Sequence, residues 1–310
     1  MPDEELQRFK TRIDLREFAA SRGYAQDRRE SSKCCAVMRH PDGQKIVIVT
    51  HKKSGDWVYY NPHDDRDNGT VIDFLQNHGG GSLGEVRKTL RAWLGGSRPV
   101  GFQLSTFGPP LLPVSRDRAG VMQAWECARV CFTLPYLTGR GIGPEVLLLP
   151  RFAGCVRVDR RNNALFPHYD KDGLCGFEMK NKDFTGFAAG GNKGLWFSKA
   201  FPSDRQLVLT ESAIDALSYQ VLHPDELWTR YMSTGGALNS QQPALLRGAM
   251  EKLPPGAVVL LAFDHDEGGE KLADEVKAIA PAGRELRRIL PEVGTGKDWN
   301  EMLKYRLGLT

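Results

Sequence analysis

The chain has 310 residues, of which 41% are hydrophobic and 26% are charged. These proportions are ordinary for a soluble globular protein, and the length leaves room for more than one domain. The formal net charge of +4 at pH 7 is mild, so an argument for a nucleic-acid partner must come from local charge. Six cysteines, a start without signal-peptide character and no long apolar span argue against disulfides and predict a cytoplasmic protein without membrane association.

Residues 1–96 are predicted to form a small mixed domain. Apolar periodicity, a hairpin turn and the capping residues Thr70 and Ser82 predict its elements. These are a helix over 13–21, strands over 45–50 and 56–60, a helix from Thr70 to Leu75, and a helix over 83–94. Residues 97–118 are rich in Pro, Gly and Ser, and two adjacent prolines cannot lie inside a helix, so we expect a linker there.

Residues 13–95 resemble the zinc-ribbon domain of bacterial replicative primases in the order and wording of IDLREFAASRGY, KCCAVMRH, DNGTVIDFLQ and SLGEVRKTL. In that family a Cys-Pro-x-His hook and a later Cys-x-x-Cys hook hold zinc. Cys34 matches the first cysteine, but the rest of the first hook is absent and 60–64 contains no cysteine. His40 and His63 are candidate substitute ligands beside Cys34. Because structural zinc needs a closed ligand set, we expect a ribbon without zinc.

Residues 119–200 are predicted to form a small α+β lobe. A helix over 120–132 is followed by antiparallel strands over 155–158, 164–166, 174–180 and 194–197. Basic and aromatic residues alternate here, which suits a groove for nucleotides or single-stranded DNA, since cations hold phosphates and exposed rings stack on bases. The candidate binding residues are Arg157, Arg160, Lys180, Lys182 and Lys193, among Phe177, Phe184, Phe187 and Trp196. The alternative is that the rings are core and the charges form a solvated face.

The wording of this lobe resembles the amino-terminal half of the primase polymerase core. YLTGRGIGPEVL, NALFPHYDKDGLCGFEMK and GGNKGLWFSK follow the order of that family's segments. Where those primases carry glycine and arginine, this chain has Met179 and Lys180, which keeps a positive charge without an arginine's bidentate grip. His168, in FPHYD, is expected to be a strand residue with access to solvent and no catalytic role.

Residues 201–310 alternate between apolar strands and helices, which predicts a mostly parallel sheet with helices packed against it. The expected strands span 206–210, 228–233, 257–263 and 284–291, and the helices span 212–222, 240–252, 267–280 and 299–306. Glu211 ends the first strand, and Asp264 and Asp266 end the third. Because ligands bind at the carboxyl ends of parallel strands, these carboxylates predict a magnesium or manganese site. The alternative is that each acid only caps the helix that follows it.

The same segment resembles the Toprim domain, which primases share with topoisomerases and some nucleases. Glu211 stands at that family's invariant glutamate, Asp264 and Asp266 at its paired aspartates, and Asp298 in its last acidic segment, GTGKDWN. The resemblance implies that the paired aspartates bind the metal ion. Glu211 then completes the site or acts as general acid/base, and Asp298 is an outer ligand. Further residues at matching positions are Lys297, a candidate for nucleotide binding, and the supporting Asp215, Gly235 and Gly236.

Together these features predict an α/β protein: a Toprim-type mostly parallel sheet with flanking helices, preceded by a small mixed α+β lobe and an N-terminal zinc-ribbon-like β domain. The expected function is primase-like, namely magnesium-dependent joining of nucleoside triphosphates on a single-stranded DNA template. The alternatives are a Toprim nuclease or nickase and a nucleic-acid-binding module without activity. The sequence contains no Gly-x-x-x-x-Gly-Lys-Ser/Thr loop, so a helicase or relaxase is expected to be a separate partner.

Overall fold

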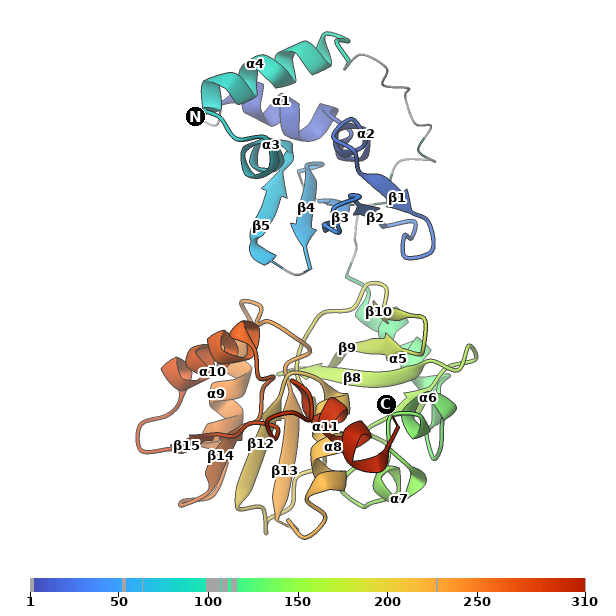
Figure 1. The fold of residues 1–310 in the computed structure, drawn as a ribbon, viewed down its shortest axis with the longest axis vertical. Coiled ribbons are helices and arrows are strands. Elements are labelled where there is room, and N and C mark those ends of the chain that lie inside the picture. Colours follow the sequence, from blue (N-terminus) through green and yellow to red (C-terminus); the bar gives the residue numbers. More distant parts are fainter. Residues whose placement is uncertain are drawn as a thin grey trace. The chain divides into compact units, whose positions relative to one another are not determined.

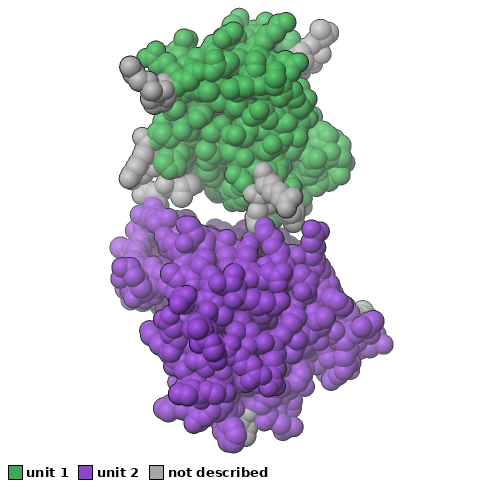
Figure 2. Space-filling view, turned by 90° about the vertical axis from the view of Figure 1, so that its left-hand side faces the viewer, with its two compact units in different colours: residues 1–115 green, residues 116–310 purple. Residues whose placement is uncertain are grey.

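The computed structural model describes residues 3–51, 54–62, 64–98, 107, 111–112, 116–226 and 228–309. The chain divides into two compact units, residues 1–115 and residues 116–310 (Figure 2). The division falls within residues 97–118, the stretch whose composition is that of a linker. Within the described ranges, no helix combines the length and the apolar character needed to cross a membrane.

The first unit contains an antiparallel sheet and helices (Figure 1). Its strands are β1 (Ala25–Asp27), β2 (Cys35–Arg39), β3 (Lys45–Thr50), β4 (Trp57–Asn61) and β5 (Asp64–Thr70), which pair in that order. Its helices are α1 (Glu4–Arg12), α2 (Leu15–Ala20), α3 (Val71–Gly79) and α4 (Leu83–Leu94). Thr70 and Ser82 cap α3 and α4 through capping boxes, as their sequence positions indicate. The helix expected over 13–21 begins only at Leu15, because Asp14 has extended backbone and caps it.

Two of the candidate zinc ligands cannot share one metal ion, which corrects the substitute site considered from the sequence. Cys34 immediately precedes β2, and His40 immediately follows it. Six residues of extended strand span roughly 20 Å, whereas the ligands of one zinc ion lie within a few ångströms of one another. The Nδ1 atom of His40 instead lies 2.8 Å from an Asp42 carboxylate oxygen. His63 lies outside the described residues.

Aromatic side chains hold the interior of the first unit together. The buried ring of Phe74 makes edge-on contacts with Phe18, Tyr24 and Tyr59, at centroid distances of 6.2, 5.7 and 5.2 Å. The Tyr59 hydroxyl donates a 2.7 Å hydrogen bond to Asp67, so the polar end of this buried ring is satisfied. Apolar burial and aromatic contacts of this kind stabilise a core.

Metal analysis of the purified protein tests this description of the first unit. We expect less than about one tenth of a zinc ion per chain after dialysis against a chelator, and a melting temperature that the dialysis does not change. Removing a structural zinc ion would instead lower the melting temperature, because its binding energy contributes to folding. Emission spectroscopy measures the metal content, and circular dichroism measures the melting. One tightly held zinc ion per chain would contradict the expectation.

The second unit begins with a lobe that is built on an antiparallel sheet. Its helices are α5 (Arg118–Glu126), α6 (Pro135–Thr138) and α7 (Pro144–Leu147). Its strands are β6 (Arg129–Val130), β7 (Arg157–Val158), β8 (Ala164–Asp170), β9 (Gly173–Lys180) and β10 (Thr185–Phe187), in the sheet order β10-β9-β8-β7-β6. The helix expected over 120–132 ends early, because the chain turns at Cys127 and then pairs β6 with β7.

The rest of the second unit is a mostly parallel sheet with helices on both faces (Figure 1). Its strands are β11 (Trp196–Phe197), β12 (Gln206–Thr210), β13 (Thr229–Ser233), β14 (Val258–Leu261) and β15 (Glu285–Arg288), in the order β11-β13-β12-β14-β15. Its helices are α8 (Ala213–Leu222), α9 (Gln242–Glu251), α10 (Glu267–Ile279) and α11 (Trp299–Leu307). Only β11 pairs antiparallel within this sheet. The α/β architecture expected for residues 201–310 is confirmed.

Side chains that alternate along the central strands build a separate core on each face of this sheet. Val208 of β12 and Leu260 of β14 belong to the cluster that contains α8 and α11 residues. Leu207 and Leu261 belong to the opposite cluster, which contains α9 and α10 residues. Because both faces are covered, the strands are apolar without interruption, as is typical of parallel sheets. The sheet therefore presents its carboxyl edge as the natural position for a polar site.

Candidate metal and nucleotide site

Two carboxylates follow the central strands at the point where the strand order changes direction. Glu211 comes directly after β12, and Asp264 comes three residues after β14 ends. β13 lies on one side of β12 and β14 on the other, so the connections from these strands diverge. In open α/β sheets such a point is where ligands bind, outside the carboxyl ends of the strands.

The loop after β13 is fixed against the backbone of Glu211. The N–H groups of Gly235 and Gly236 both donate to the Glu211 carbonyl oxygen, at 2.8 and 3.1 Å. Both glycines have positive φ angles, 67° and 89°, which residues with a side chain rarely adopt. The glycine pair that the sequence marks as supporting thus lies beside the first carboxylate.

Asp266 caps a helix, as the alternative interpretation of the acids predicts, and Asp298 caps another. Asp266 accepts a 2.9 Å hydrogen bond from the N–H of Gly269 at the start of α10, and Asp298 accepts one of 2.7 Å from Glu301 in α11. The second Asp266 oxygen lies 2.9 Å from the Lys297 ammonium. Capping explains one oxygen of each carboxylate, so these two acids alone do not argue for a metal ion.

Asp264 differs from the other acids, because capping does not explain it. Its Oδ1 atom is buried and has no hydrogen-bond partner, and its side chain is only 13% exposed. The Lys297 ammonium is 3.9 Å from its Oδ2 atom, which is too far for a hydrogen bond. A buried carboxylate oxygen without a partner is costly. It therefore indicates a missing ligand.

Several carboxyl groups repel one another at this edge. Burial, together with the charges of Asp215, Glu211 and Asp298, raises the pKa of Asp264 to about 8. Burial and the charge of Asp266 raise the pKa of Glu211, and burial raises the pKa of Asp215 to about 6. Such mutual repulsion is the pattern that a bound cation relieves.

The chemistry of these groups fits a hard divalent cation. Within the described part of the chain, no three or more His, Cys, Asp or Glu side chains form a group that could hold a metal ion by itself. Magnesium does not require one, because it prefers oxygen ligands, keeps several waters and shares substrate phosphates. The unpartnered Asp264 oxygen and the neighbouring Glu211 and Asp266 carboxylates therefore suit magnesium or manganese better than zinc.

Removing the charge of Asp264 is expected to stabilise the protein when no metal ion is present. Because its folded-state pKa is raised to about 8 from 3.8, ionising Asp264 costs folding free energy, and stability is lost as pH rises between these values. Asp264→Asn should therefore melt a few degrees higher than the parent protein at pH 8 in a chelator, and lose less stability between pH 6 and pH 8. Thermal melts at the two pH values measure this, and equal pH slopes would contradict it.

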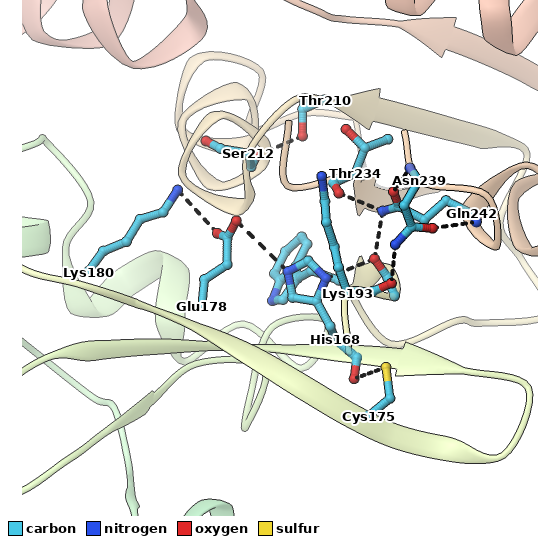
Figure 3. Close-up of polar contacts among 12 residues, drawn as sticks. His168, Cys175, Glu178, Lys180, Lys193, Thr210, Ser212, Thr234, Asn239 and Gln242 are labelled. Carbon is cyan, nitrogen blue, oxygen red and sulfur yellow. Dashed lines mark hydrogen bonds and ion pairs between the residues drawn. The ribbon is translucent and has the colours of Figure 1, made fainter. Parts of the chain in front are cut away.

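Three lysines from different segments surround the acidic edge. Lys297 pairs with Asp266, Lys180 of β9 lies 3.1 Å from a Glu178 carboxylate oxygen, and Lys193 donates to the Ala237 carbonyl oxygen at 2.6 Å. Burial is the main cause that raises the pKa of Glu211, and the charges of all three lysines partly offset this rise. Figure 3 shows that Lys180 and Lys193 reach toward the ends of β12 and β13 from the lobe. The lobe thus contributes cations to the edge of the other sheet.

The remaining candidate binding residues lie in different surroundings. The Arg157 guanidinium stacks over Trp125, 4.6 Å from the ring centroid, and donates to the Trp125 carbonyl oxygen at 2.6 Å, so it holds α5 in place. Arg160 and Lys182 are exposed. The core interpretation is correct for two of the rings, since Phe177 and Trp196 are buried, whereas Phe184 is 37% exposed.

For two residues near the site, the sequence does not predict the surroundings that the structure shows. His168 is 1% exposed, so the expected access to solvent is wrong: β9 and the loop after β13 cover it. Glu178, also on β9, was not singled out, although it pairs with Lys180. Only its place two residues before a candidate lysine, on the same face of the strand, could have drawn attention to it.

The matches to protein families divide the second unit into two parts. Residues 208–303 match the family described as Toprim-like, and residues 135–205 match a family described as a protein of unknown function, DUF3991. The segment with Glu211, Asp264 and Asp298 is therefore a Toprim-like domain. This confirms the resemblance that the acidic motifs predict.

Among curated proteins, a relative is the DNA helicase/primase of Enterobacteria phage T3, which is 24% identical over 220 residues. The match covers 70% of this chain, but the chain spans only 34% of the length of that relative. The chain thus contains a segment that matches the Toprim-like family, and it resembles a protein named DNA helicase/primase.

Among solved structures, the primase fragment of the bacteriophage T7 primase-helicase is 18% identical and has a TM-score of 0.40, over 70% of this chain and 83% of that one. A T7 lagging-strand DNA polymerase structure with primase domains of two gp4 subunits, an RNA/DNA hybrid and dTTP includes a chain that is 24% identical. Its TM-score is 0.42, over 57% of this chain and 86% of that one.

Proposed function

We propose that the chain is a primase-type nucleotidyltransferase, which joins nucleoside triphosphates on a single-stranded DNA template with magnesium or manganese. One observation carries the proposal: Asp264 has a buried, unpartnered oxygen among other carboxylates at the carboxyl edge of the sheet. A divalent cation with oxygen ligands fits such a group. The similarity to a protein named DNA helicase/primase directs the proposal toward DNA-templated joining rather than another phosphoryl transfer.

The carboxylates would divide the work of holding the ion. Asp264 and Asp266 would bind it directly, Glu211 would complete the set or serve as general acid/base, and Asp298 would act from farther away. When bound, the ion would lower the pKa of the attacking 3′-hydroxyl and stabilise the charge on the leaving pyrophosphate. The support for these roles is that the charges of Glu211 and Asp298 act on Asp264, and the charge of Asp266 acts on Glu211.

The cations around the edge would bind the substrates. Lys180, Lys193 and Lys297 would hold the triphosphate of the incoming nucleotide, because their charges already act on Glu211. The exposed Arg160 and Lys182 would hold the phosphates of the DNA template. Arg157 does not belong to this set, because its guanidinium is engaged by Trp125. A helicase or relaxase is a further proposed partner.

A product assay tests the proposal. The protein is incubated with single-stranded DNA, labelled ribo- or deoxynucleoside triphosphates and magnesium or manganese, and the products are separated by length. New oligomers that require both template and metal ion are the expected result. Shortened or nicked DNA would support the nuclease instead, and DNA binding without any product would support the binding module.

A further inference from the structure

Glu178 and Lys180 form an ion pair that is shielded from solvent and lies next to the acidic edge. The Lys180 ammonium is 3.1 Å from the Glu178 Oε2 atom, and the two side chains are only 16% and 13% exposed. Burial acts to raise the pKa of Glu178, but the charge and hydrogen bond of Lys180, together with the charges of His168 and Lys193, hold that pKa below its ordinary value. Glu178 is therefore a carboxylate, and Lys180 its counter-ion.

The His168 ring lies beside Glu178 (Figure 3). The backbone of Gly235 lies close to the second carboxylate oxygen of Glu178, Oε1. The His168 Nδ1 atom lies 2.8 Å from the Gly194 carbonyl oxygen, which can only accept, so Nδ1 carries the proton. Burial lowers the pKa of His168, which keeps the ring neutral and leaves Nε2, 4.0 Å from Glu178 Oε1, without a proton to donate. A Cβ at Gly235 would lie 2.8 Å from this same oxygen, so only glycine fits there.

This enclosure leaves Glu178 with little freedom to move away from Lys180. Nε2 of His168 has no hydrogen-bond partner, so the ring fills space beside Glu178 without competing for its charge. The Lys180 ammonium lies within hydrogen-bonding distance of this carboxylate. The charge of Lys180 also acts on Asp215 and Glu211, so those acids would attract the ammonium if Glu178 did not hold it.

We infer that Glu178 is a positioning residue that holds the Lys180 ammonium off the acidic edge, so that the edge stays open to a divalent cation. The inference rests on the proposed function, because it assumes that the edge binds magnesium. Lys297 shows the opposite arrangement, since its ammonium lies directly on Asp266 at 2.9 Å. Two lysines on these acids at once would neutralise the charge that attracts the ion.

The test measures the affinity for magnesium alone, through the rise of the melting temperature with magnesium concentration. Glu178→Ala is expected to weaken magnesium binding about tenfold, because the freed ammonium moves onto the acids. Glu178→Gln, which keeps an acceptor oxygen, should weaken it less. The double variant Glu178→Ala with Lys180→Ala should return to within about threefold of the parent affinity, since the competing ammonium is gone.

Asp204→Asn is the control, because Asp204 also forms an ion pair that is shielded from solvent, 2.9 Å from Arg151, in the same unit. It should lower the melting temperature without changing the magnesium affinity. Two results would overturn the inference alone, provided that magnesium stabilises the parent protein. One is a magnesium affinity of Glu178→Ala equal to that of the parent. The other is a double variant whose magnesium affinity is no higher than that of Glu178→Ala. A parent protein that shows no magnesium response would overturn both the inference and the metal site of the proposed function.

Discussion

Replacing Asp264 with alanine is expected to reduce template-directed nucleotide joining by about a thousandfold. The reason is that a catalytic metal ion supplies several kcal/mol of transition-state stabilisation, and Asp264 is the one acid of the set whose buried oxygen lacks a partner. The loss should appear in kcat, since the ion acts on the reacting atoms. Initial rates of oligomer formation at saturating nucleotide and magnesium measure it.

A surface acid of the same unit provides the control. Asp274 lies on α10, is 74% exposed and pairs with Lys277 in the next turn, at 2.8 Å. Asp274→Ala should leave the rate within about twofold of the parent, because exposed ion pairs contribute little. Joining activity that survives in Asp264→Ala would show that the metal ion is held elsewhere. Activity lost in both variants would point to unfolding, which a melting curve detects.

The second large effect is expected at Trp299, which fixes the start of α11. Its ring is 3% exposed and lies edge-on to Tyr219, and its Nε1–H donates to the Ala262 carbonyl oxygen at 2.8 Å. Trp299→Ala should lower the free energy of unfolding by about 4 kcal/mol, through the cavity and the orphaned carbonyl group. For a unit of this size the melting temperature should fall by roughly 10 °C.

Two variants separate the contributions of Trp299. Trp299→Phe keeps most of the packing but loses the donor, so it should cost about 1–2 kcal/mol. Trp228→Ala removes an indole that is 63% exposed, and should change stability by less than about 0.5 kcal/mol. Urea unfolding followed by circular dichroism measures all three. If Trp299→Ala lowered the free energy of unfolding no more than Trp228→Ala, the conclusion that Trp299 anchors α11 would be wrong.

Elements with a strong local pattern could be predicted from the sequence. β12 and α8 follow from an uninterrupted apolar run and a helix that begins with the Ser212 cap. The helix predicted over 120–132 extends past the observed end of α5 at Glu126. That end depends on the pairing of β6 with a strand almost thirty residues farther along the chain. Local periodicity contains no information about such a partner.

The sequence predicts where the acids lie along the chain, but not the contacts that each acid makes. The order of Glu211, Asp264 and Asp266 along the chain suggested one edge, and the sheet places the first two after neighbouring strands. Which acid caps a helix and which keeps an unpartnered oxygen depends on loop geometry that residue types do not reveal. The burial of Glu178 could not be predicted for a similar reason. A glutamate on a strand normally faces water, and only packing of the loop after β13 makes it an interior charge.

The pairing of β11 with β13 has a consequence for how these proteins can be recombined. The family match that covers the lobe ends at residue 205, so it includes β11, although Trp196 and Phe197 pair with β13 in the Toprim-like sheet. A chimera that joined this Toprim-like domain to a lobe from a relative would therefore import a foreign edge strand. Successful exchanges should retain native Trp196 and Phe197. The part of the chain that must stay together is therefore larger than the segment that matches the Toprim-like family, residues 208–303.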